Sequence, residues 1–226
     1  MVYKTSKETQ EKKDLKRKHI IKIAARIFSQ NGYHKTTVKD VVEAADISVG
    51  TFYFYFKNKE HLFETLYDEG IEEIFSALMQ SLQNIECEAD FGFSKAIAFF
   101  FKVIECNKPL AKIMLIEAVG LNPTFERKRA EATQKLVSYT TEFFYEIKKL
   151  GTGNMPDIKI FALAFIGTLY NVVLEWLQTD SKESLLDSVY ALTVYNLQAL
   201  KLEYNIDNIN RGITEIINTK LDNLKE

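Results

Sequence analysis

The residues from 50 to 56 carry side chains whose types and spacing suit contact with a nucleic acid. Neighbouring residues on a helix are about 100° apart, so the consecutive aromatic residues here cannot all face one core. Phe52 and Phe56 are four residues apart and are expected to pack inward. Tyr53 and Tyr55 then present hydroxyl groups to solvent. Such groups are suitable partners for phosphate oxygens and base edges.

Short helices are expected to position these side chains. Helix N-caps are predicted at Thr37 with Asp40, at Ser48 and at Asn58, which places three helix starts within about twenty residues. Helices that short bury little surface, so a longer helix over residues 15–31 must supply much of the core. The order of elements is that of a helix-turn-helix unit.

The charge distribution supports the same interpretation. The whole chain has a formal net charge of −2, but residues 1–60 carry +6 and residues 61–226 carry −8. Positive charge confined to one end suits a phosphate backbone without making the whole protein adhere to nucleic acid. The alternative is that the basic run is only a solvated face.

The composition favours an all-α protein. Nine Gly and three Pro are few for a turn-rich β architecture, and polar residues interrupt the apolar ones at helical spacing. No run approaches the roughly 18 apolar residues of a membrane span, and the charged N-terminus does not resemble a secretory signal. We therefore expect a soluble cytoplasmic protein with no membrane partner.

No motif indicates a metal or a cofactor. Cys87 and Cys106 are isolated, and His19, His34 and His61 show neither HExxH nor ExxH spacing. The two cysteines could form a redox pair or a metal site, but ordinary thiols in a reducing compartment are the expectation. A nucleophile elbow and a phosphate loop are also missing, so we expect no enzymatic activity.

The rest of the chain is predicted to form a larger helical domain, which a helix over residues 59–85 joins to the basic end. Gly70 lies inside that helix, where Ala would raise helix propensity by about 1 kcal/mol unless close packing requires the Gly. The helix over residues 156–178 is apolar on nearly all sides and must be covered on all sides. With the helix over residues 182–204 it is expected to form a four-helix interface between two copies, the alternative being a merely interior helix. The expected interface residues are Phe161, Leu169, Val173, Trp176, Leu185, Val189, Leu192 and Asn196.

Aromatic residues of the middle helices could line an apolar ligand cavity. At helical spacing they could equally form ordinary core. These helices carry little charge that looks buried, which favours a largely apolar ligand. The candidate pocket residues are Phe99, Phe100, Met114, Phe125, Phe143, Phe144 and Phe165.

Residues 16–66 contain three runs that carry a resemblance to a known family. They are Ile20-Ile21-x-x-Ala24-Ala25, Gly32-Tyr33-x-x-Thr36-Thr37-Val38-x-Asp40-Val41, and Ser48-x-Gly50-Thr51-Phe52-Tyr53-x-Tyr55-Phe56-x-x-Lys59-Glu60. This stretch resembles the TetR/AcrR-like bacterial transcriptional regulators. Asp46 departs from the glycine that the family usually has at the turn, but Asp tolerates a left-handed backbone better than most residues. The resemblance implies contacts to DNA at Thr37, Lys39, Ser48, Gly50, Thr51, Tyr53 and Tyr55, and to a phosphate at Lys59.

The resemblance also implies a domain organisation and a function. It implies a three-helix helix-turn-helix DNA-binding domain over residues 1–58 and a larger helical ligand-binding and dimerisation domain over residues 59–226. We expect a homodimeric repressor that a small, largely apolar ligand releases from double-stranded operator DNA. The alternative is a DNA-binding protein of the same architecture that a protein partner controls.

Overall fold

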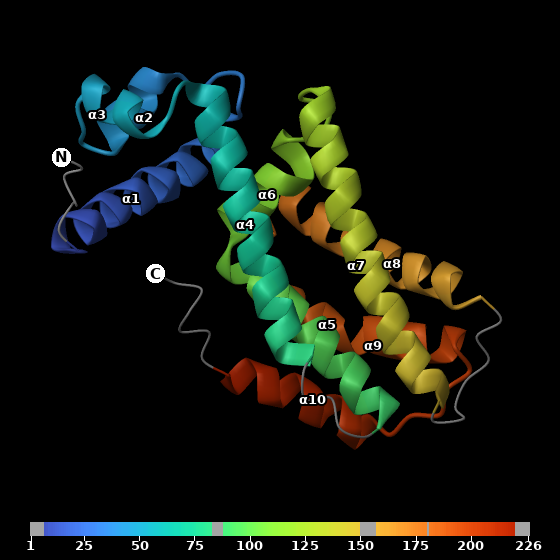
Figure 1. Ribbon diagram of the computed structural model, residues 1–226. Coiled ribbons are helices and arrows are strands. Elements are labelled where there is room, and N and C mark those ends of the chain that lie inside the picture. Colours follow the sequence, from blue (N-terminus) through green and yellow to red (C-terminus); the bar gives the residue numbers. More distant parts are fainter. Residues whose placement is uncertain (1–6, 83–87, 150–156, 180, 220–226) are drawn as a thin grey trace. The chain divides into compact units, whose positions relative to one another are not determined.

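The computed structural model describes residues 7–82, 88–149, 157–179 and 181–219. Across these ranges every regular element is helical, which confirms the expected all-α class (Figure 1). Cys87 lies outside the described residues, and Cys106 is an exposed free thiol.

Contacts divide the chain into two compact units. The first unit comprises Met1–Glu72 and Pro109–Val119, and the second comprises Glu73–Lys108 and Gly120–Glu226. The segment Pro109–Val119 therefore packs with the N-terminal helices although it is far from them in sequence. The functional boundary expected after residue 58 stays a prediction.

The first unit is built around a long basic helix, which begins earlier than the predicted start at residue 15. An exposed ion pair with 2.8 Å between Lys12 Nζ and Glu8 Oε1 lies in its first turns. Pairs with this i,i+4 spacing favour a helix. The elements of this unit are α1 (Lys7–Asn31), α2 (Val38–Ala44), α3 (Val49–Tyr55), the first part of α4 (Lys59–Leu82), most of α6 (Lys108–Lys112) and the π-helical turn η1 (Ile113–Glu117).

All three predicted N-caps are confirmed. Asp40 N donates to Thr37 Oγ1 at 3.3 Å, and Thr37 N donates to Asp40 Oδ2 at 2.7 Å, which forms a capping box. Ser48 Oγ and Asn58 Oδ1 each accept a backbone N–H from three residues on, at 3.0 Å and 2.7 Å. Asp46 has a φ of 49°, the left-handed value expected at this turn.

Apolar residues from four helices form the core of the first unit. The rings of Phe28 in α1 and Phe63 in α4 meet edge to face, with their centroids 5.1 Å apart. Ile47, in the turn between α2 and α3, is half-buried. The other buried residues of this core include Ile20, Ala24, Ile27, Val41, Val42, Ala45, Leu62 and Leu66.

The segment Pro109–Val119 makes two specific contacts within the first unit. Glu117 Oε2 accepts a hydrogen bond from Tyr33 N at 3.1 Å, just beyond the end of α1. Leu110 packs against Gly70 of α4 so closely that a Cβ at Gly70 would lie 2.7 Å from Leu110 Cδ2. Close packing therefore requires the glycine, because Leu110 fills the space that a side chain at position 70 would occupy. The gain in helix propensity expected for Ala does not apply without a shift of Leu110.

In its described residues, the second unit contains six helical elements besides the end of α4. Its C-terminal helix packs along the first of them, and a Cβ at Gly212 would lie 2.9 Å from the carbonyl oxygen of Phe91. An ion pair with 2.5 Å between Lys95 Nζ and Glu215 Oε1 joins the same two helices. The six elements are α5 (Ala89–Cys106), α7 (Pro123–Lys149), α8 (Ile158–Gln178), the 3-10 turn η2 (Leu185–Ser188), α9 (Val189–Ala199) and α10 (Ile206–Asn218).

The single helix expected over residues 182–204 is wrong, because η2 and α9 occupy this stretch and α9 ends at Ala199. Lys201 N donates to Gln198 O at 3.0 Å, and Leu202 N donates to Leu197 O at 2.9 Å. This pair of bonds is a Schellman motif, which ends a helix. Its left-handed position holds Lys201, with a φ of 54°, so no glycine marked this end in the sequence.

α8 has one buried side and one open side. Ala162, Phe165 and Val173 are buried within the second unit, whereas Ile160 is 59% and Leu163 is 42% exposed. Contrary to expectation, this helix is long and apolar enough to cross a membrane by length and composition alone, with a mean hydropathy of 1.8. A core helix of a soluble protein also passes this test. Because apolar residues on the open side of α8 are exposed in the single chain, we expect another apolar surface to pack against them.

Candidate functional site

α3 turns a row of side chains away from the core of the first unit. Phe52 is 0% and Phe56 is 1% exposed, which confirms that both pack inward. Tyr53 is 55% exposed, so much of this residue is open to solvent. Tyr55 is half-buried, and its ring lies edge-on to that of Phe54 with 4.9 Å between the centroids. The two tyrosines therefore lie outside the buried side of the helix, and Tyr53 is the more exposed of the two.

The start of α3 is open to a close approach. Ser48 Oγ accepts from Thr51 N at 3.0 Å and lies 2.9 Å from Thr51 Oγ1. Gly50 is exposed, and a Cβ there would meet Ser48 Oγ at 3.7 Å, which is an ordinary contact. A small residue at this position leaves room for a DNA strand to approach the helix backbone.

The predicted contact residues at α2 have different environments. Thr37 Oγ1 donates to Asp40 Oδ2 at 2.8 Å. The hydrogen bond from the Thr37 backbone, and then that from its side chain, lower the pKa of the Asp40 carboxyl. Lys39 is exposed, with 3.6 Å between its Nζ and Glu43 Oε1. Exposed pairs of this kind are weak, so the Lys39 ammonium can exchange this partner for a phosphate.

Lys59 is tied to the loop between α1 and α2. Its Nζ donates to the carbonyl oxygens of Tyr33 and Thr36, both at 2.8 Å, and lies 4.2 Å from the centroid of the Tyr33 ring. Burial lowers the pKa of the Lys59 ammonium. The structure therefore gives this side chain a role in holding the loop, and its contact with a phosphate stays a prediction.

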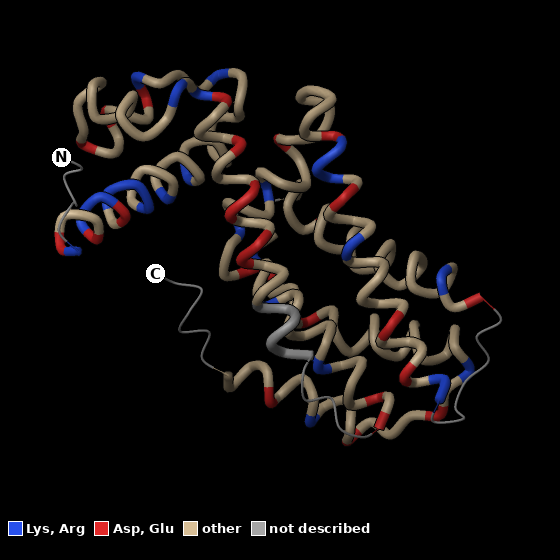
Figure 2. Tube along the Cα trace, viewed as in Figure 1, with Lys and Arg blue, Asp and Glu red and all other residues tan. Residues whose placement is uncertain are grey.

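Positive charge gathers along α1, as Figure 2 shows. Two of its basic residues reach the other helices of the first unit. Lys13 Nζ lies 5.4 Å from the centroid of the Phe54 ring in α3. Arg17 Nη2 lies 2.5 Å from Glu69 Oε1 in α4. The basic helix is thus adjacent to the outer face of α3, as a surface for a phosphate backbone requires.

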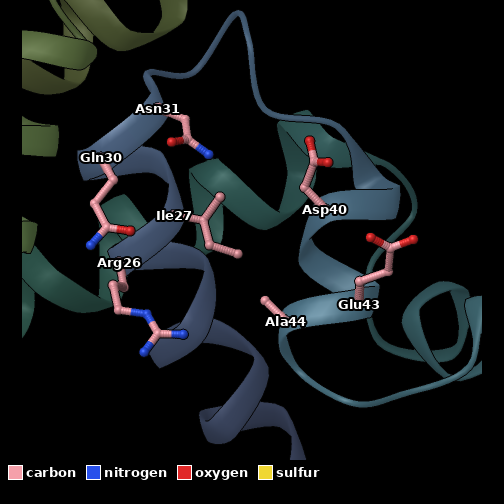
Figure 3. Close-up of a pocket in the computed structure, with 7 residues that line it drawn as sticks. All are labelled: Arg26, Ile27, Gln30, Asn31, Asp40, Glu43 and Ala44. Carbon is pink, nitrogen blue, oxygen red and sulfur yellow. The ribbon is translucent and has the colours of Figure 1, made fainter.

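A solvent-open depression of about 640 Å³ lies between α1 and α2. Figure 3 shows Ile27 of α1 directed towards α2, with Asp40 and Glu43 along the opposite wall. Five of the seven described lining residues have polar side chains, and the depression is open to solvent, so it differs from the apolar cavity expected for a ligand. The described lining residues are Arg26, Ile27, Gln30, Asn31, Asp40, Glu43 and Ala44.

Residues 20–66, which include α2, α3 and their caps, match the sequence model of the bacterial regulatory proteins of the tetR family. The N-terminal part of the chain is a DNA-binding domain of the tetR family. In keeping with this domain and with its relatives, the chain is a DNA-binding transcriptional regulator.

Relatives of this chain extend the likeness to most of its length. The fatty acid metabolism regulator protein of Bacillus subtilis (strain 168) is 23% identical over 169 residues, which is 74% of this chain and 86% of that protein. FadR from Bacillus halodurans, a fatty acid degradation regulator, has 24% identity and a TM-score of 0.74 over 83% of this chain and 97% of that chain. FadR from Bacillus subtilis in complex with stearoyl-CoA has 22% identity and a TM-score of 0.69 over 79% of this chain and 96% of that chain. At this level of identity the structures establish the fold.

Three of the predicted pocket residues meet in one cluster of rings in the second unit. Phe143, Phe144 and Phe165 surround Phe93, with centroids 5.4 Å, 5.6 Å and 5.6 Å from its own. Phe93 is fully buried and was not among the predicted pocket residues. Of the remaining candidates, Phe99 and Phe125 are buried, Phe100 and Met114 are half-buried, and Met114 belongs to the first unit.

Most of the predicted dimer residues pack within the chain itself. Trp176 is half-buried, its Nε1 donates to Glu183 O at 2.8 Å, and Lys108 Nζ lies 4.4 Å from its ring. Phe161 and Leu192 are also half-buried. The other five, Leu169, Val173, Leu185, Val189 and Asn196, are buried.

Sequence reasoning missed two exposed apolar residues of α3. Phe54 is 65% and Val49 is 54% exposed. Helical spacing could have found Phe54, because a residue two positions from both Phe52 and Phe56 lies about 200° around the helix from each. The presence of Lys13 beside the Phe54 ring depends on how α1 crosses α3, which spacing does not show.

Proposed function

We propose that this tetR-family regulator binds double-stranded operator DNA as a cytoplasmic homodimer and acts as a repressor that a small, largely apolar ligand releases. The observation that carries the DNA part is the exposed face of α3, which is rich in aromatic residues and lies beside the basic helix α1. Repression follows from occupancy, because a dimer on its operator denies that DNA to other proteins.

Operator binding uses the outward side chains and the open start of α3, together with α2. α3 is the recognition helix, and in a dimer the two copies of α3 enter successive major grooves about 34 to 36 Å apart. Lys59 supports the surface by holding the loop that precedes α2. The proposed contact residues are Thr37, Lys39, Ser48, Gly50, Thr51, Tyr53, Tyr55 and Lys59.

Tyr53→Ala tests the DNA-binding face. Tyr53 is 55% exposed, so loss of its side chain should leave the melting temperature nearly unchanged and weaken operator binding by about 1–3 kcal/mol if a base contact is lost. The operator is first selected from a random-sequence duplex library with the native protein, and affinities are then measured by fluorescence anisotropy. Tyr145→Ala, at a similarly exposed position in α7, is the matched control. A lower melting temperature with unchanged affinity would assign Tyr53 to the fold.

Dimerisation is proposed to use the open side of α8 with its neighbour α9. Ile160 and Leu163 are apolar and exposed there, and Tyr195 of α9 is also exposed. A Cβ at Gly167 would meet nothing within 4 Å among the described residues, which leaves room for another helix. Most of the predicted dimer residues lie on the inner side of the same helices. They pack within the subunit and hold the exposed side in place.

The effector is proposed to be a long-chain acyl compound bound in the second unit. A relative of the same fold was solved with stearoyl-CoA, and this likeness supports control by a small molecule over control by a protein partner. The ring cluster around Phe93 offers an apolar environment between α5, α7 and α8. Its rings contact one another, so an acyl chain would have to separate them or lie beside them.

Stearoyl-CoA should weaken operator binding, and operator DNA should weaken stearoyl-CoA binding by the same factor, because coupling between two sites is reciprocal. The factor should lie between roughly 5 and 150. Operator affinity is measured with and without stearoyl-CoA, and ligand affinity with and without operator. Free coenzyme A, which lacks the acyl chain, is the control. Tight binding of stearoyl-CoA that ignores DNA would contradict the switch, and absence of binding would contradict this class of effector.

A further inference from the structure

Phe54 is an aromatic residue that the core of the first unit does not use. It is 65% exposed, whereas each of the other phenylalanines in the described residues is buried or half-buried. Its position about 200° around α3 from the two buried rings places it on the outermost side of the recognition helix. A contribution to the core therefore does not account for this side chain.

Two neighbours hold the Phe54 ring in place. The Tyr55 ring meets it edge-on, with 4.9 Å between centroids and 90° between the planes. Lys13 Nζ lies 5.4 Å from its centroid. A cation near the ring is electrostatically favourable and brings positive charge from α1 to the outer edge of α3. The result is an apolar surface with a positive charge beside it.

The outermost side of a helix that enters the major groove faces the edges of the base pairs. There the bases present hydrogen-bonding groups and one apolar group, the C5 methyl of thymine. Phe54 has no group that forms ordinary hydrogen bonds, so the thymine methyl is the feature that its ring can distinguish. Lys13 beside it suits a backbone phosphate, which fixes position but carries no sequence information.

We propose that Phe54 reads the C5 methyl group of thymine in the operator, while Lys13 binds a neighbouring phosphate. This inference rests on the proposed operator binding and adds a residue that determines specificity. It also defines a feature of the operator, which must place at least one thymine methyl where Phe54 of each subunit reaches it.

Uracil substitution tests the proposal, because deoxyuridine pairs like thymidine but lacks the methyl group. The native protein selects a duplex from a random-sequence library, and each thymine of that duplex is then replaced singly by deoxyuridine. At one or more positions the native protein should bind about four-fold more weakly, the effect of removing one buried carbon group. Phe54→Ala should bind the original duplex more weakly and lose this discrimination. Phe54→Leu should retain part of it, because its side chain is still apolar.

Lys13→Gln separates the two roles. It should reduce the slope of log affinity against log salt by about 1.8, because the dimer loses one phosphate contact in each of its two subunits, and keep the uracil discrimination. Uracil discrimination that is the same in the native protein, Phe54→Leu and Phe54→Ala would overturn the assignment of Phe54. An unchanged salt slope would overturn that of Lys13. If the native protein enriches no duplex, operator binding itself fails, which is a different result from an enriched duplex that is insensitive to uracil.

Discussion

At the scale of single residues, Asp40 determines how α2 begins. The backbone N–H and the hydroxyl group of Thr37 donate to its carboxylate and lower the pKa below the ordinary value of 3.8. Because the pKa is lower in the folded state than in the unfolded state, the contribution to stability is complete above the unfolded value. It is lost as the pH falls through the lowered folded value.

Asp40→Asn should remove this part of the acid sensitivity, because the amide oxygen still accepts hydrogen bonds but does not titrate in this range. The melting temperature of the native protein should therefore fall more steeply below about pH 4 than that of the variant. Thermal melts followed by circular dichroism at a series of pH values measure the melting temperature of both proteins. Glu43→Gln, on the same helix, is the control and should follow the native protein. If the melting temperatures of the native protein and Asp40→Asn fell in parallel at acid pH, the capping hydrogen bonds would not contribute to the acid sensitivity.

Residue chemistry predicted the helix caps that frame the candidate DNA surface. Caps depend on residues three positions apart, so Thr37, Ser48 and Asn58 were visible in the sequence. The bonds from Lys59 Nζ to Tyr33 and Thr36 were not visible, because they depend on how the loop before α2 folds back on α4. Spacing along one helix therefore finds local bonds and the inward face, but it does not find partners from another element.

At the scale of elements, the contact between α4 and α6 explains why a glycine stands inside a long helix. Gly70 lies in α4, where Ala would ordinarily be more stable by about 1 kcal/mol. Leu110 occupies the space that a side chain would need. Overpacking of this kind costs about 1–3 kcal/mol when neighbours must move. The two effects oppose each other at this position.

Gly70→Ala should therefore not stabilise the native protein, because Leu110 must shift to admit the methyl group. In a Leu110→Ala background the same substitution should raise the free energy of unfolding by about 1 kcal/mol, since the obstruction is gone. Urea denaturation of the native protein, the two single variants and the double variant gives the coupling free energy between positions 70 and 110. Equal stabilisation in both backgrounds would show that Leu110 imposes no constraint.

Element boundaries can be read from the sequence where particular residue types signal them. Asn122 and Pro123 mark the start of α7, and Gly120 adopts a φ of 69° before it. The end of α9 carries a Schellman motif on Lys201, for which composition gives no indication. The π-helical form of η1 was likewise not predicted, because it is a matter of hydrogen-bond register.

At the scale of the whole molecule, the open side of α8 is the proposed contact between two copies of the chain. Periodicity identified α8 as apolar all round but did not separate the residues buried in one chain from those left for a partner. Trp176 is engaged by Glu183 and Lys108 within the chain, so changing it would disturb the subunit as well as the dimer. An exposed residue of α8 gives a cleaner test.

Leu163→Glu should convert the dimer to a monomer with little change in subunit folding, because the side chain is 42% exposed in the single chain. A charge buried in an apolar interface without a partner is costly. Sedimentation velocity measures the mass, and circular dichroism measures the helicity. Tyr145→Glu on α7 is the control and should remain dimeric. A dimer that survives Leu163→Glu, or a native protein that is monomeric, would exclude this surface.

The place of the segment Pro109–Val119 in the first unit affects how this unit folds during protein synthesis. The ribosome completes Met1–Glu72 before it has made this segment, which belongs to the same compact unit. At about 5 to 20 residues per second, the delay is roughly 2 to 9 seconds. During that interval the backbone N–H of Tyr33 lacks the Glu117 carboxylate to which it donates in the finished protein. The nascent DNA-binding helices therefore acquire their final packing only after α5 has been translated.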